Sequence, residues 1–189
     1  MKYSEKMNLS PYIERYSYFP ELTNILFREL GPRIRSRKYL TCADLALICV
    51  WKALLWQVYD PMKWEQASVH PDTDKDKIRR VTASIFETDF LDKLQVRSLL
   101  ESLVSLNGVG FPVATTILSV TRPDLYGVVD RHVLSALDYK TDDVNAFVEA
   151  IFRIREIARE QSRLNSGVAW TPRMVDMALW KLDQENGAR

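Results

Sequence analysis

Apolar residues recur at helical spacing along almost the whole chain. The first clear stripe lies between residues 20 and 30, and Gly31-Pro32 after it predicts the end of that helix. No stretch alternates between apolar and polar residues as a half-buried strand would. The sequence therefore predicts an all-α fold. The other predicted helices cover 42–59, 76–88, 91–106, 111–121, 141–160 and 171–182.

The predicted helix over 42–59 is apolar on nearly all sides, which is typical of a helix at the centre of a domain. Thr41 and Asp44 have the spacing of a capping box at its start. A polar stretch with prolines follows over 60–77 and indicates a loop and lobe boundary. We expect a single unit over 1–189. One lobe comprises about 1–60 and 141–189, and the other about 75–140.

Composition narrows the classes of function. The chain has 189 residues, of which 47% are apolar, as expected for a folded domain. No apolar run approaches the roughly 20 residues of a membrane span, and the N-terminus has no signal-peptide core. Cys42 and Cys49 lie in one predicted helix and match no zinc or iron–sulfur spacing. We therefore expect a cytoplasmic monomer with no membrane partner, no metal and no cofactor.

The net charge of +1 argues against a dedicated polyanion-binding protein. Basic residues are nevertheless concentrated in two runs, Arg33–Lys38 and Lys75–Arg80. Each run is consistent with a solvated helix face. A solvated face is the usual meaning of such runs, and they indicate phosphate contacts only beside a second signal for nucleic-acid binding.

The segment LNGVGFPVATTIL provides that second signal. Gly108 and Gly110 interrupt two predicted helices, and glycine tolerates positive φ and close approach of another backbone. Val109 can pack into the core and fix the turn. The next amides then point outward at the start of a helix, where the helix dipole favours an anion. Asn107, Gly108, Val109, Gly110 and Phe111 are therefore predicted to hold a phosphate, although a helix–helix turn without a ligand has the same local pattern.

A further motif follows the hairpin. The sequence RPDLYGVVDRHVLSAL places Val128-Val129 directly before Asp130, with His132 two positions later. Together with the hairpin, this order resembles the helix-hairpin-helix DNA glycosylase superfamily, which includes endonuclease III, MutY and the 8-oxoguanine glycosylases. The resemblance is strongest over 94–137.

The resemblance implies that Asp130 is the catalytic residue. Cleavage of an N-glycosidic bond produces an oxocarbenium-like sugar, which an ionised carboxylate stabilises while it positions a nucleophile. The base must first leave the stack. The hairpin, Arg131 and His132 are then expected to bind double-stranded DNA with a damaged, modified or mismatched base. Asp130 is also placed to cap the helix that follows it.

The chain departs from the superfamily at two positions of the hairpin. Bifunctional members have a lysine two residues after the second glycine, and Pro112 stands there in this chain. Proline has no amine, so Schiff-base lyase chemistry through this position is excluded. Monofunctional members of the superfamily also lack this lysine and use water, so the resemblance still allows hydrolysis. Asn107 replaces the proline usual in the hairpin. The cysteine quartet of an iron–sulfur cluster is also missing.

Four residues outside the hairpin are candidates for a substrate pocket. The segments PDLYGVVDRHV and TPRMVDMALW resemble a looser group of bacterial proteins with this fold. Arg173 and Asp176 share a helix face, which predicts either an internal ion pair or a substrate contact. Trp51 and Lys52 lie in the central apolar helix, where a lysine must be paired or face a cavity.

Three hypotheses follow. The first is a monofunctional DNA glycosylase, with Asp130 at the mouth of a cleft between the lobes. The second is an inactive DNA-binding module of the same fold that recognises DNA or recruits a partner. The third is a helical interaction domain in which the hairpin binds nothing.

Overall fold

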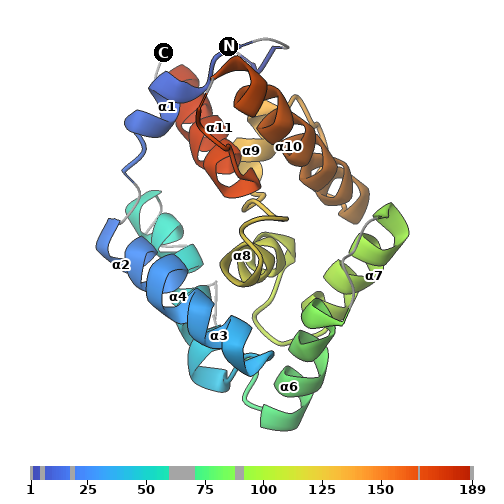
Figure 1. The fold of residues 1–189 in the computed structure, drawn as a ribbon. Helices are drawn as coiled ribbons and strands as arrows, with labels where there is room; N and C mark the ends of the chain where they lie inside the picture. Colours follow the sequence, from blue (N-terminus) through green and yellow to red (C-terminus); the bar gives the residue numbers. More distant parts are fainter. Residues whose placement is uncertain are drawn as a thin grey trace.

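The computed structural model describes residues 2–4, 7–17, 20–59, 71–87, 92–165 and 167–187, with backbone alone over 53–59. All regular structure in these ranges is helical, which confirms the predicted all-α class (Figure 1). The elements are α1 (Ser10–Glu14), α2 (Pro20–Asn24), the π-helical segment η1 (Ile25–Leu30), α3 (Gly31–Arg37), α4 (Cys42–Tyr59), α6 (Lys75–Ala83), the 3-10 turn η2 (Ser84–Phe86), α7 (Lys93–Val104), α8 (Phe111–Thr121), α9 (Arg131–Ala136), α10 (Val144–Leu164) and α11 (Pro172–Gly187).

Side-chain caps fix where several helices begin. The Thr41 hydroxyl accepts a hydrogen bond from Asp44 N at 3.3 Å, and Asp44 Oδ2 accepts one from Thr41 N at 2.6 Å. This reciprocal pair confirms the predicted capping box of α4. Thr171 caps α11 by accepting a hydrogen bond from Met174 N at 3.3 Å, as its position before a first-turn proline predicts.

The predicted helix end at Gly31-Pro32 is wrong. Helix α2, η1 and α3 form one helical stretch from Pro20 to Arg37. Within the π turn, Gly31 N donates to Leu26 O, and Pro32 then lies in the first turn of α3, where no donor is required. Gly31 also lies against α8, because a Cβ at this position would come within 2.6 Å of Val120 O.

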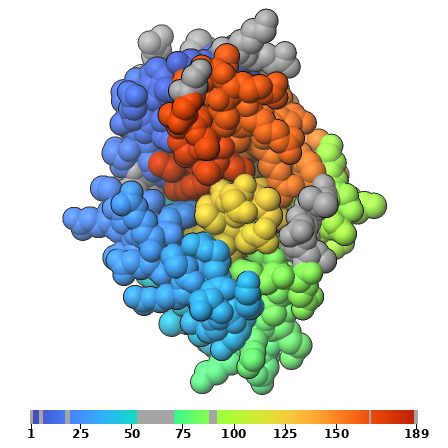
Figure 2. Space-filling model, viewed as in Figure 1, coloured from blue at the N-terminus to red at the C-terminus, as the bar shows by residue number. Residues whose placement is uncertain are grey.

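Helix α8 lies at the centre of the molecule (Figure 1). In this view α1, α9, α10 and α11 lie above it, and α2, α3, α4, α6 and α7 lie beside and below it. The buried apolar side chains of both groups belong to one contiguous core. The chain after α8 passes from the lower group to the upper one, and part of it is visible at the surface in yellow (Figure 2). The division into two lobes stays a prediction, and most of its boundary loop lies outside the described residues.

Within the described ranges, no helix has both the length and the apolarity to cross a membrane. The same part of the chain contains no group of three histidine, cysteine or acidic side chains that could hold a metal ion. Cys42 and Cys49 are free thiols, and burial raises the pKa of Cys49 to about 11.

Candidate functional site

A short extended segment brings Asp130 to the start of α9. Val128 and Val129 are 3% and 0% exposed, which confirms that they anchor the segment in the core. Val128 N donates to Asp176 Oδ2 at 2.7 Å, and Val129 N donates to the Thr115 hydroxyl at 3.0 Å. Helices α11 and α8 therefore hold the segment from two sides and fix the position of Asp130.

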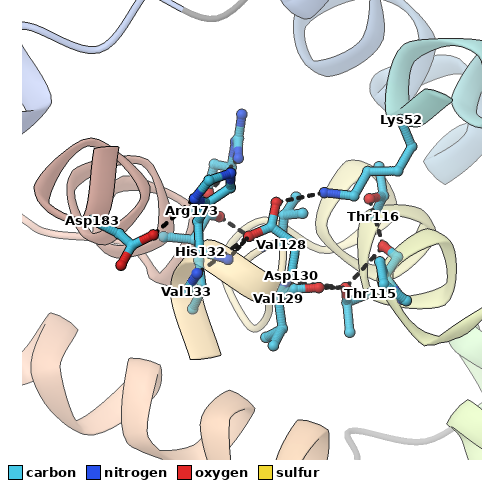
Figure 3. A network of polar contacts seen from close by, with 12 residues as sticks. Lys52, Thr115, Thr116, Val128, Val129, Asp130, His132, Val133, Arg173 and Asp183 are labelled. Atoms are coloured by element: carbon cyan, nitrogen blue, oxygen red, sulfur yellow. Dashed lines mark hydrogen bonds and ion pairs between the residues drawn. The ribbon is translucent and has the colours of Figure 1, made fainter. Parts of the chain in front are cut away.

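The carboxylate of Asp130 forms a buried ion pair with Lys52 of α4 (Figure 3). Nζ lies 2.7 Å from Oδ2, and the two side chains are only 7% and 8% exposed. Oδ1 accepts hydrogen bonds from the amides of His132 at 3.0 Å and Val133 at 3.2 Å, so Asp130 also caps α9. Burial by itself raises the pKa of Asp130, but Lys52, His132 and the Val133 amide outweigh it and bring the pKa below its usual value. The carboxylate is therefore ionised at neutral pH.

Asp130 and Lys52 line a small cavity between α4, α9 and α11. Its volume is about 10 Å³, close to the space that one water molecule needs. Ligand pockets are typically about 300–1,000 Å³, so the expectation that Asp130 lies at the mouth of an open cleft is wrong for this closed structure. The described lining residues are Tyr16, Trp51, Lys52, Val128, Asp130, Val133, Arg173, Asp176 and Trp180.

A second buried ion pair lines the same cavity. Arg173 Nη1 lies 2.5 Å from Asp176 Oδ1, which confirms the predicted internal pair on α11. Arg173 also donates to the Tyr16 hydroxyl at 3.3 Å, and its guanidinium lies 4.3 Å from the ring centroid of Phe27. Burial, reinforced by the charge of Asp130, raises the pKa of Asp176 to about 7 despite the arginine. One cavity therefore holds two carboxyl groups whose pKa values are displaced in opposite directions, a pattern that recurs in active sites.

His132 is tied to α11. Its Nδ1 lies 2.8 Å from Asp183 Oδ2, and Ser135 donates to the other oxygen of Asp183 at 2.7 Å. The imidazole meets the Trp180 ring edge-on, with 5.6 Å between centroids. Its Nε2 is buried without a partner among the described residues. Arg131, in contrast, is exposed and borders an open hollow of about 400 Å³ beside α9. DNA contacts by these two residues stay a prediction.

The hairpin has the geometry that its glycines predict. Gly108 has a φ of 77°, in the left-handed region that favours glycine, and Val109 is buried as expected. Asn107, Gly108 and Gly110 are exposed. The first intrahelical hydrogen bond of α8 runs from Ala114 N to Gly110 O at 2.9 Å. Val109 N already donates to Leu106 O at 3.1 Å and Pro112 has no N–H. The amides of Gly110, Phe111 and Val113 precede the hydrogen-bond ladder and have no protein partner among the described residues, so they are available to an anion.

Neighbouring elements hold the hairpin in place. Asp72 N donates to Asn107 O at 3.0 Å, and Asn107 N donates to Asp72 Oδ2 at 3.2 Å. Lys77 of α6 lies 2.8 Å from the same carboxylate oxygen. The partly buried ring of Phe111 packs on Phe147 of α10, with 5.2 Å between centroids. The Phe111 side chain therefore has an internal packing role, and its backbone is the part that belongs to the turn.

Replacement of Asp72 by Asn is expected to destabilise the protein in a pH-dependent way. Hydrogen bonds from Lys77 and from the Asp74 and Asn107 amides lower the pKa of Asp72 from 3.8 to about 2. Because the folded-state pKa is depressed, the stabilisation is complete above about pH 4 and is lost as the pH falls towards about 2. Melting temperatures of both proteins should differ most at neutral pH and converge near pH 2. A difference independent of pH would show that the charge of Asp72 does not hold the hairpin.

The structure brings the predicted pocket residues together around Asp130. None of the hairpin residues lines the cavity within the described part of the chain. The link between the two regions is α8, because its first turn belongs to the hairpin and Thr115, one turn later, binds the backbone next to Asp130. The pocket residues that were predicted and line the cavity are Trp51, Lys52, Arg173 and Asp176.

Sequence reasoning missed Tyr16, Thr115 and Asp183. Asp183 could have been found, because it lies seven residues after Asp176 and therefore on the same face of α11. Thr115 stands in an apolar helix, where a buried hydroxyl needs a partner, but nothing in the sequence names that partner. Tyr16 precedes the first predicted helix and carries no local signal.

Comparison of the chain with protein-family models, with curated proteins and with solved structures finds no match.

Proposed function

We propose that the protein is a monofunctional DNA glycosylase of the helix-hairpin-helix class. It hydrolyses the N-glycosidic bond of a flipped damaged, modified or mismatched base in double-stranded DNA. One observation carries the proposal: a buried, ionised Asp130 caps α9, and the helix before it, α8, begins at a hairpin whose glycines are exposed. The small cavity keeps this carboxylate away from bulk water, where its charge acts more strongly on a developing cation.

The hydrogen bonds of Asp130 leave one direction for chemistry. A carboxylate accepts about four hydrogen bonds. Three donors among the described residues reach Asp130: the His132 and Val133 amides on Oδ1 and Lys52 on Oδ2. The remaining lone pair is on Oδ2, the oxygen that also pairs with Lys52 beside the cavity. A water molecule bound there is placed for attack on the sugar, while the carboxylate stabilises the oxocarbenium ion.

The substrate has to enlarge the cavity. A volume of about 10 Å³ does not accommodate a nucleobase, so binding must displace at least one lining side chain. Tyr16 is the partly exposed member of the described lining, and its ring meets Trp180 edge-on with 5.5 Å between centroids. In the proposed reaction the flipped base enters past Tyr16, and the hairpin amides hold a phosphate of the distorted strand.

The test is base release from a panel of duplexes that carry damaged, mismatched or hypermodified bases, followed by alkaline cleavage of abasic sites. At least one duplex should show breaks after alkali and none before it. Borohydride should trap no covalent adduct, because Pro112 has no amine. An adduct that disappears in Lys52→Met would instead make Lys52 a nucleophile and the enzyme bifunctional.

The second candidate is a DNA-binding module that does not cleave. It is favoured by the closed cavity and by the lysine that neutralises Asp130 in the absence of substrate. The two candidates differ in one observable quantity, because only the enzyme produces alkali-sensitive sites in a duplex that it binds.

Gly110→Val is expected to weaken duplex binding at least tenfold, with a loss of stability of no more than about 1 kcal/mol because Gly110 is the N-cap of α8. Among the described residues, a Cβ at Gly110 meets Pro112 Cδ alone, at 3.8 Å, so the turn has room for the side chain. A bound phosphate at the amides of this turn has no room for an isopropyl group. Fluorescence anisotropy and thermal melting measure the two effects. Wild-type affinity in the folded variant would remove the hairpin from the DNA interface.

A further inference from the structure

The two basic runs of the sequence meet on one surface at the lower end of the molecule (Figure 2). Tyr39 lies between them, with the Arg37 guanidinium 5.2 Å and the Arg79 guanidinium 4.6 Å from its ring centroid. A buried hydrogen bond of 2.9 Å from Leu40 N to the Thr82 hydroxyl joins the same two segments. The end of α3 and the exposed face of α6 are therefore held together by the fold.

Part of the positive charge in this region is already neutralised. Arg37 forms an ion pair with Asp44, and Lys77 forms one with Asp72. Arg33 has Glu29 at 3.8 Å. Because these cations are already paired within the protein, they contribute little to the binding of an external ligand.

Five cations of the two runs are left over. Arg35 is partly buried and donates to the backbone carbonyls of Val120 and Thr121, and exposed Arg80 lies one residue off the helix face that Lys75 and Arg79 share. We call the other three the basic surface: Lys38, Lys75 and Arg79. All three are exposed, and none forms an ion pair with a carboxylate in the described part of the chain. Lys75 and Arg79 are four residues apart and share one face of α6. Lys38 adopts a left-handed backbone conformation at the end of α3, and its amine lies 5.2 Å from the ring centroid of Phe86.

The basic surface is continuous with the hairpin through α6. The hydrogen bonds between Asp72 and Asn107 place the start of α6 next to the hairpin, and Lys75 is the first residue of that helix. Helix α6 has nine residues, so it is about 13 Å long. Along a duplex with a phosphate every ~3.4 Å per strand, this length corresponds to about four base pairs. A single duplex can therefore reach both places.

We propose that the basic surface binds the phosphate backbone of the duplex whose distorted strand is held by the hairpin. Two exposed acids lie nearby: Asp76 is in the first turn of α6, and Asp74 precedes the helix and caps it with its carboxylate. Exposed positive charge at the end of α3 and along α6 fits a row of phosphates and carries no base preference. The proposal rests on the duplex-binding part of the proposed function and is independent of base release.

The test compares Lys75→Gln/Arg79→Gln with Arg159→Gln/Arg163→Gln. The second pair removes the same charge at the same i,i+4 spacing from exposed positions on α10, away from the basic surface (Figure 1). The affinity for an undamaged 20-base-pair duplex is measured from 50 to 200 mM salt. Each lost phosphate contact should reduce the slope of log K against log salt by about 0.9, so the α6 variant should lose nearly 2 and the control nothing.

An unchanged slope in the α6 variant, or an equal change in the control, overturns the proposal. Equal competition by poly-glutamate and by unlabelled duplex at matched charge also overturns it, because the surface would then bind acidic chains in general. Single-turnover base release at saturating protein separates the two proposals. If the slope changes but no base is ever released, the proposed enzyme activity is wrong and the proposed role of the basic surface still holds.

Discussion

Asp130→Asn is expected to lower the rate of base release by at least about 100-fold while duplex binding persists or tightens. Asparagine keeps the shape of the side chain, and its oxygen can still accept the His132 and Val133 amides that cap α9. It carries no negative charge to stabilise an oxocarbenium ion or to polarise a water molecule. Single-turnover base release and anisotropy on the same duplex measure the two effects separately.

The same substitution has a larger effect on stability than the sequence predicts. As a helix cap alone, Asp130→Asn should cost no more than about 1 kcal/mol. The structure shows that the substitution also leaves the Lys52 ammonium buried without a counter-charge, and breaking a buried pair costs about 3–5 kcal/mol. Urea unfolding should give a loss in this higher range. Asp143→Asn is the matched control, because Asp143 is an exposed cap of α10 that accepts Ala146 N at 3.0 Å.

The outcome that contradicts the enzyme proposal is a folded Asp130→Asn protein that releases the base at the wild-type rate. Asp130 would then be a cap and an ion-pair partner only. Loss of base release in Asp143→Asn as well would point to general destabilisation and not to the chemistry of Asp130. Measurements at a temperature well below the melting point of each variant keep these outcomes distinct.

The helices could be predicted because their signals are local. The limits of α8 follow from Gly110 before it and from the apolar run 111–121, and the structure reproduces them. The start of α11 follows from Thr171 and Pro172. The helix end expected at Gly31-Pro32 failed, because the π turn that absorbs the proline depends on close packing against α8, which is a tertiary contact.

The candidate site could be predicted only in part. The Arg173–Asp176 pair lies within one helix turn and was visible as a spacing, whereas Lys52 and Asp130 are 78 residues apart. Burial predicted that Lys52 needs a partner, but the choice among the acidic residues depends on how α4 packs on α8. The small size of the cavity depends on side chains from several helices, so no single segment of the sequence predicts it.

The two buried pairs make the cavity sensitive to the loss of any one charge. Asp176 is held by Arg173 and by Val128 N, and Asp130 is held by Lys52 and by two amides of α9. The Val128 hydrogen bond joins the pairs, because it fixes the segment that carries Asp130. A charge removed from one pair therefore alters both the protonation and the position of the Asp130 carboxylate.

Lys52→Met is expected to cost about 3–5 kcal/mol in the free energy of unfolding at neutral pH. Methionine fills a similar volume, so the principal effect is a buried carboxylate without its counter-charge. The matched control is Lys93→Met. Its partner Glu149 lies at the same 2.7 Å, but the two side chains are 52% and 47% exposed. An exposed pair of this kind contributes at most about 1 kcal/mol. The double variant Lys52→Met/Asp130→Asn should recover much of the loss, because it buries no unpaired charge.

The pH dependence of Lys52→Met identifies the cause of its instability. With Lys52 present, the pKa of Asp130 lies below its usual value, so the group stabilises the fold above about pH 4 and this contribution is lost in acid. Without Lys52, burial raises the pKa of Asp130, and the sign is reversed: the variant becomes less stable as the pH rises from about 4 towards neutrality. The stability deficit relative to wild type should therefore shrink from pH 7 to pH 4, and base release at neutral pH should fall as the carboxyl group takes up a proton. A deficit that stays constant over this range would mean that Lys52 contributes packing and that the charge of Asp130 is maintained by other groups.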